Sequence, residues 1–222
     1  MRLKVNAQFI LPITLEEYLR SHRMDELKQY LEVTETYLAK AGRDFEASIY
    51  ARANKLPEEE RNEFLDFNLD DIWQHQEIFP RILRNSLFLA IISLLEFEIG
   101  DLCRTLKKSK DIRINLSDLK GDILEQVKIY LNNARLEHVS LNPFWQDINN
   151  YYLVRNCIAH NHGVIKGAGK EQALRDYLGK KGIISKDTII EEVALTSQFC
   201  NEVVEKIQNF LVELSKIVIG ES

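Results

Sequence analysis

The chain has 222 residues, of which 45% are hydrophobic and 28% are charged, and its formal net charge at pH 7 is -5. This length is enough to bury a hydrophobic core without disulfide or metal staples, and the composition excludes a disordered chain. The negative net charge argues against a protein whose whole surface binds polyanions non-specifically.

The three cysteines, Cys103, Cys157 and Cys200, lie far apart and include no C-x-x-C pair. They therefore suggest neither a disulfide framework nor a zinc site. The N-terminal segment lacks the apolar core of a signal peptide, and the most apolar run, Ser86–Leu95, has only ten residues before the first glutamate, too few to cross a bilayer. We expect a cytoplasmic protein without metal, cofactor or membrane segment.

The first half of the chain predicts two long helices joined by an acidic segment. Apolar residues recur at helical spacing from Thr14 to Gly42, and the helix can continue to Tyr50. The acidic segment, residues 58–77, is predicted as a short helix and a connection. A long apolar core helix is expected from Arg81 to Leu106, with Pro80 in its first turn.

The second half predicts three more helices. Asp122 can cap a helix that ends near Leu136, and Phe144–Asn161 forms the next one, with Gly163 placed to cap its end. Residues 183–190 suggest a short β-hairpin or extended pair. The last helix starts near Thr196 and carries one apolar stripe, formed by Phe199, Val203, Ile207, Phe210, Leu211 and Leu214. The prediction is an all-α bundle of about five main helices.

The residues best suited to chemistry lie near the end of the helix predicted at 144–161. Arg155, Asn156 and His160 are close in sequence, and Asn156 and His160, four residues apart, share a helix face. Metal-independent cleavage of RNA needs a group that transfers protons and a cation that stabilises the charge on the phosphate. Imidazole and guanidinium supply these two properties.

The same positions also have a structural explanation. Histidines favour the negative end of the helix dipole, and Asn161 and Gly163 are typical residues at the end of a helix. An arginine followed by a histidine at about this spacing is expected by chance in a chain of this composition. Spacing alone therefore leaves both interpretations open.

The wider segment YYLVRNCIAHNHG, residues 151–163, resembles the motif helix of the HEPN superfamily, which has the pattern R-N-x-x-x-H. The resemblance extends from about residue 80 onward and includes a long earlier helix of the form S-L-L-E and an amphipathic last helix. It implies a single HEPN-like domain over residues 1–222, with a core at about 80–222. Residues 1–79 would supply an opening helix and an acidic extension.

The resemblance also implies site residues. Arg155, Asn156 and His160 correspond to the catalytic positions, and an acidic residue on the earlier helix would orient Arg155. Glu96 is the first candidate, with Glu98 and Asp101 as alternatives. Relatives silenced by a nucleotidyltransferase antitoxin carry Tyr two residues after the His, whereas this chain has His162, a possible accessory group.

A basic stretch follows the motif. Two acidic residues, Glu171 and Asp176, stand against six basic ones, which are Lys166, Lys170, Arg175, Lys180, Lys181 and Lys186. Lys166 and Lys170 are the candidates for contact with an RNA backbone, and a solvated charged loop is the alternative.

Together these features predict a metal-independent endoribonuclease of the HEPN type, acting as a toxin or defence effector. The resemblance implies a homodimer with a composite site and a partner such as an antitoxin. The alternative is a non-catalytic HEPN module that binds nucleotide, RNA or a partner protein, with the acidic segment as a docking surface.

Overall fold

The computed structural model describes residues 15–110, 112–185 and 190–220, and this part of the chain is all-α, without a β-strand. The α-helices are α1 (Leu15–Ala53), α2 (Glu58–Trp73), α3 (Phe79–Lys110), α4 (Ile123–Asn133), α5 (Asn142–Asn161), α6 (Glu171–Lys181) and α7 (Ser197–Ile219). A π-helical turn, η1 (Gln74–Ile78), and two short 3₁₀ turns, η2 (Leu116–Asp118) and η3 (Val139–Leu141), complete the set. None of the described helices is long and apolar enough to span a membrane.

The acidic segment is not a connection, as the sequence had suggested, but part of one continuous helical rod. The elements α2, η1 and α3 follow one another without a gap from Glu58 to Lys110, and Pro80 is buried inside the rod. Proline has no N–H to donate, and its ring crowds the carbonyl four residues earlier. The π turn immediately before Pro80 changes the hydrogen-bond register and so lets the helix continue through the proline.

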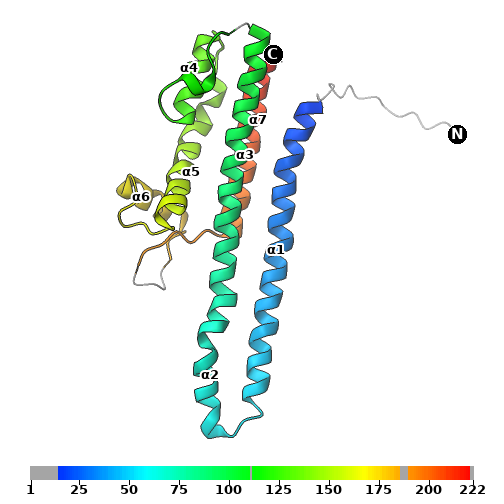
Figure 1. Ribbon diagram of the computed structural model, residues 1–222, viewed down its shortest axis with the longest axis vertical. Coiled ribbons are helices and arrows are strands. Elements are labelled where there is room, and N and C mark those ends of the chain that lie inside the picture. Colours follow the sequence, from blue (N-terminus) through cyan, green and yellow to red (C-terminus); the bar gives the residue numbers. More distant parts are fainter. Residues whose placement is uncertain (1–14, 111, 186–189, 221–222) are drawn as a thin grey trace, which may run out of the picture.

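Three long helices run side by side and form the spine of the molecule. Figure 1 shows α1 antiparallel to the α2–α3 rod, with α7 along the upper part of α3 and with α4, α5 and α6 on the other side. The far half of α1 and all of α2 project beyond the other helices as a two-helix arm. The predicted first helix is confirmed from Leu15, while Thr14 lies outside the described residues.

The core forms where α3, α5 and α7 meet. The six residues of the predicted α7 stripe are all buried, and Phe199 makes ring contacts with Phe88 of α3 and Tyr151 of α5 at centroid distances of 6.1 Å. Burial of large apolar side chains along a single helix face is what an amphipathic stripe predicts. The expected boundaries of α5 and α7 agree with the structure to within a few residues.

The predicted β-hairpin is replaced by two isolated bridges. Ile184 pairs with Val193, and Val164 pairs with Glu192, each in an antiparallel arrangement too short to count as a strand. The segment before α7 thus fastens to the chain that follows α5, while residues 186–189 lie outside the described part. The helix α6 was not predicted, because only Leu174 and Leu178 of its residues are buried.

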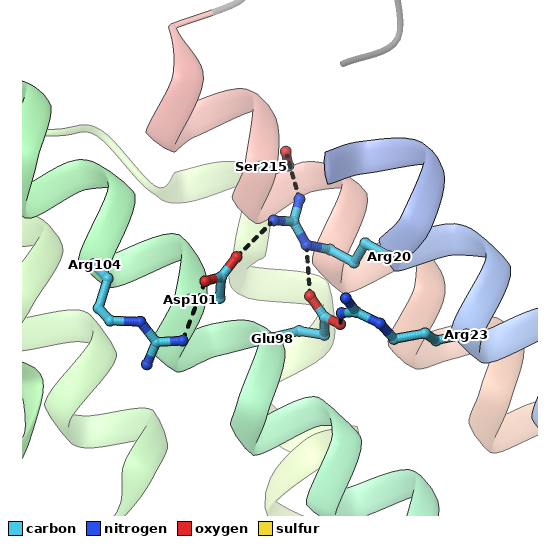
Figure 2. Close-up of polar contacts among 6 residues, drawn as sticks. All are labelled: Arg20, Arg23, Glu98, Asp101, Arg104 and Ser215. Atoms are coloured by element: carbon cyan, nitrogen blue, oxygen red, sulfur yellow. Dashed lines mark hydrogen bonds and ion pairs between the residues drawn. The ribbon is translucent and has the colours of Figure 1, made fainter. Parts of the chain in front are cut away.

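A buried ion-pair network joins α1 to α3 and α7 (Figure 2). The Glu98 side chain, 1% exposed, accepts a hydrogen bond from Arg20 Nε at 2.8 Å and another from Arg23. Arg20 also donates to the Ser215 hydroxyl at 3.4 Å and lies 3.6 Å from the Asp101 carboxylate. Two arginines of α1 therefore converge on one carboxylate of α3, and one of them also reaches α7.

We predict that Glu98→Ala lowers the free energy of unfolding by about 3–5 kcal/mol, because the buried Arg20 guanidinium loses its nearest carboxylate and keeps only the more distant Asp101. The matched control is Glu213→Ala, which removes a partly exposed pair with Lys216 on α7 and should cost less than about 1 kcal/mol. Urea unfolding followed by circular dichroism measures both values. Equal midpoints for the two variants would contradict a role for Glu98 in holding α1.

Candidate functional site

The residues predicted to carry chemistry meet at the C-terminal end of α5. Arg155 Nη1 donates to Asn156 Oδ1 at 3.0 Å and lies 3.3 Å from His160 Nε2. Asn156 and His160 are exposed and Arg155 is partly exposed. The sequence-based expectation that these three side chains lie together is therefore met in the geometry, while their catalytic role remains a prediction.

The contact between Arg155 and His160 constrains the imidazole. A guanidinium has only donors, so it can form a hydrogen bond only with a ring nitrogen that has a free lone pair. This contact orients His160 Nε2 toward Arg155 Nη1. A guanidinium beside an imidazole supplies the two types of group needed to bind a phosphate and to transfer a nearby proton.

The end of α5 is shaped by two left-handed residues. His162 has φ 53°, Gly163 has φ 83°, and the N–H groups of both point to the Cys157 carbonyl. Asn161 then donates from its side chain to the carbonyls of Val164 and Lys166 and so folds the chain back over the helix end. The predicted cap at Gly163 is thus preceded by a left-handed His162, whose exposed side chain bonds to none of the site residues in the described structure.

The acidic candidates on α3 separate into two groups. Glu98 and Asp101 face α1, where they pair with Arg20, so neither of these alternatives contacts Arg155. Glu96 forms no ion pair with Arg155 among the described residues, and the expected direct contact is absent.

Tyr152 interacts electrostatically with both Glu96 and Arg155. Burial raises the pKa of Tyr152, the Glu96 carboxylate raises it further, and the Arg155 guanidinium opposes the shift. The Tyr152 hydroxyl is buried, and Glu96 approaches it without completing a hydrogen bond of standard geometry. Glu96 therefore neighbours the site through a tyrosine that sequence reasoning did not single out, although its position three residues before Arg155 places it on the same face of α5.

The basic stretch after the motif is partly neutralised. Arg175 pairs with Glu171 and Glu191, and Lys181 pairs with Glu202 at 3.2 Å. The Gly167 N–H and Arg175 lower the pKa of Glu171, which fixes the start of α6. Lys166 and Lys170 are exposed and have no ion pair in the described structure, whereas Lys186 lies outside it.

The cysteines contribute no nucleophile to this site. All three are free and buried, and burial raises the pKa of Cys103 to about 12, of Cys157 to about 11 and of Cys200 to about 12. Their thiols stay protonated near neutral pH, where only a thiolate would react. Within the described ranges, no group of three or more His, Cys, Asp or Glu side chains is placed to hold a metal ion.

Comparison with protein-family models, with curated proteins and with solved structures finds no match to this chain.

Proposed function

We propose that this chain is a metal-independent endoribonuclease of the HEPN type, acting in the cytoplasm without a cofactor. The observation that supports the proposal is the contact of the Arg155 guanidinium with both Asn156 and His160 on an exposed helix end. Resemblance of residues 151–163 to the HEPN motif helix supports the same assignment. A toxin or defence effector controlled by an antitoxin-like partner is the corresponding biological role.

The proposed reaction follows from the chemistry of these groups. When the Arg155 guanidinium turns to the phosphate, His160 Nε2 is released and removes the proton of a ribose 2′-hydroxyl, and the resulting oxygen attacks the adjacent phosphorus. Arg155 binds the non-bridging phosphate oxygens, and Asn156 holds the guanidinium through its Oδ1 atom. The bond from phosphorus to the 5′-oxygen breaks, and this oxygen takes a proton from protonated His160 of a second copy. The products are a 2′,3′-cyclic phosphate and a 5′-hydroxyl.

The RNA strand would approach over the chain that leaves α5. Lys166 and Lys170 lie on this segment with their charges unpaired in the described structure, and Asn161 anchors its backbone. Such lysines bind phosphates without reading the base sequence.

We predict that His160→Ala reduces the cleavage rate by on the order of 10² to 10⁴, because it removes the proton-transfer group. Arg155→Lys keeps the positive charge but loses the planar guanidinium, whose Nη1 contacts both Asn156 and His160 and whose other donors can bind the phosphate, so it should also impair cleavage. The assay incubates each protein with total RNA in chelator and identifies the fragment ends.

The matched control is His22→Ala, which removes an exposed histidine on α1. It should cut like the wild type and leave cyclic-phosphate ends. Undiminished cleavage by His160→Ala would refute the assignment of this residue.

The second copy is proposed to bind along an α3 face whose own residues are uncharged, although the Arg23 and Arg104 guanidinium groups lie over the Phe97 ring at one end. This face consists of Ile82, Ser86, Ala90, Ser93 and Phe97, all exposed and spaced by three or four residues. Ile82 is 55% and Phe97 is 52% exposed, although both are large apolar residues. The small residues between them would let a second helix approach closely, and Glu96 places this face next to the candidate site.

We expect Ala90→Glu to convert the dimer to a monomer and to abolish cleavage, since a carboxylate would be buried without a partner in the interface. Ala47→Glu, at an exposed position of α1, is the control and should change neither property. Analytical ultracentrifugation measures the mass. A dimer that survives Ala90→Glu would place the interface elsewhere, without deciding whether the chain cleaves RNA.

A second candidate function, a protein-interaction module, is favoured by the arm. Exposed carboxylates at Glu60, Glu63, Asp70 and Asp71 surround Phe67 at distances of three, four or seven residues along α2. None of the acidic side chains of α2 forms an ion pair in the described structure, and Phe67 is 83% exposed. This surface suits a basic partner segment with apolar anchors.

If the arm is such a docking surface, a synthetic amphipathic helix of lysine and leucine should bind it with an affinity that falls as salt rises. Phe67→Ser should weaken binding by about tenfold, the effect of losing one apolar anchor of roughly 1.4 kcal/mol. Tyr37→Ser, at another exposed aromatic residue of the arm, is the control. Equal affinity for both variants would exclude Phe67 as an anchor.

A further inference from the structure

A cavity of about 350 Å³ lies between α3, the η2 turn and α4, at the opposite end of α5 from Arg155 and His160. Its wall on α3 consists of Gly100, Cys103, Arg104 and Lys107, a single helix face. This volume falls at the lower end of the range for small-molecule sites. It is large enough for one or two rings with a substituent, but too small for a folded nucleic acid.

The polar part of the cavity is cationic. Arg104 and Lys107 both line it, and no carboxylate does. Lys107 Nζ donates to Asn115 Oδ1 at 2.5 Å, so its hydrogen-bond partner is neutral and its charge is not cancelled. Arg104 pairs with Asp101 at 3.1 Å, on the side that faces the Arg20 network in Figure 2, and it has further donors to offer. The positive charges of Arg104 and Lys107 therefore favour a ligand with an anionic group.

The rest of the cavity is mostly apolar. Leu116 and Ile123 line it together with the ring of Tyr130, whose residue is 1% exposed. The Tyr130 hydroxyl lies within hydrogen-bond distance of the carbonyls of Cys103, at 3.3 Å, and Ile114, at 3.4 Å. The hydroxyl is therefore satisfied by the backbone, and the ring serves as an apolar surface. Such a surface beside two cations suits a ligand with a ring at one end and an anion at the other.

The loop that closes the cavity is held in place by its own hydrogen bonds. Asn115 and Asp118 form a capping box across η2, with the Asn115 N–H donating to Asp118 at 2.8 Å. Gln126 donates to the carbonyls of Leu119 at 3.2 Å and Gly121 at 3.0 Å. The cavity is therefore formed before any ligand arrives, which reduces the entropic cost of binding.

Gly100 is the smallest residue that lines the cavity. A Cβ atom at this position would lie 3.5 Å from Arg104 Nη1, an ordinary contact, so a methyl group would fit. A longer side chain would extend into the space beside Arg104. Glycine in the middle of a helix lowers its stability by about 1 kcal/mol relative to alanine, and no contact in the described structure requires glycine here.

We propose that this cavity binds a small aromatic anion, in which a ring lies on Leu116, Ile123 and Tyr130 and a phosphate contacts Arg104 and Lys107. The site is separate from the Arg155 and His160 site, and its occupation needs neither RNA nor a second copy.

The test uses 1-naphthyl phosphate as the probe and the full chain as the protein, with binding measured by isothermal titration. We expect one saturable site per chain. Removal of both cations in Arg104→Gln, Lys107→Gln should weaken binding at least tenfold, and Gly100→Leu should abolish it by filling the cavity. Arg155→Ala should bind like the wild type, which separates this site from the proposed nuclease site.

Two further probes test the two parts of the ligand. Uncharged 1-naphthol and inorganic phosphate should each bind at least tenfold more weakly than 1-naphthyl phosphate. Circular dichroism establishes that each variant is folded. If Gly100→Leu does not fold, the double variant, which replaces the exposed Arg104 and the half-buried Lys107, still tests the proposal. Absence of saturable binding, or unchanged affinity in the folded double variant, would overturn the proposal.

Discussion

The position of α1 depends on the buried carboxylate of Glu98. Two cations of α1, Arg20 and Arg23, converge on it, and Arg20 also reaches Ser215 of α7. A buried carboxylate is costly unless it is paired and hydrogen-bonded, so an arrangement of α1 that left Glu98 alone would be strongly disfavoured. Apolar contacts along α3 and α7 would tolerate small shifts of α1, whereas this charge fixes its register. The same contact also sets the direction of the arm, because the first helix of the arm is the far half of α1 itself.

The spacing of apolar residues predicted correctly those helices that bury a single face. The α7 stripe and the α5 helix were correct because each buries one continuous face. The prediction failed where the local sequence pattern favours one structure and the packed protein adopts another. Pro80 ordinarily starts a helix, but here a π turn carries the rod through it, and α6 buries too few residues to show a period. The hairpin predicted at 183–190 is not formed by the described residues of that segment, and Ile184 instead forms an isolated bridge with Val193.

The candidate site was predictable in its local part only. Arg155, Asn156 and His160 belong to one helix, so their spacing was enough to bring them together. The acidic partner comes from another helix, and sequence cannot give the rotation of α3 relative to α5. Glu96 and Glu98 are two residues apart, which turns them about 200° around the helix axis. One therefore neighbours Tyr152 and the other faces α1, although both follow the same apolar run.

The exposure of the site bears on how it could work. A guanidinium and an imidazole in contact with water gain little from electrostatic preorganisation, since solvent screens their interaction with a phosphate. One copy also presents a single motif histidine beside Arg155, whereas RNA cleavage by 2′-hydroxyl attack needs a base and an acid at the same time. A second copy against the uncharged α3 face would exclude water and supply the second histidine. Exclusion of water and supply of a second histidine are independent requirements, and the same proposed interface would satisfy both.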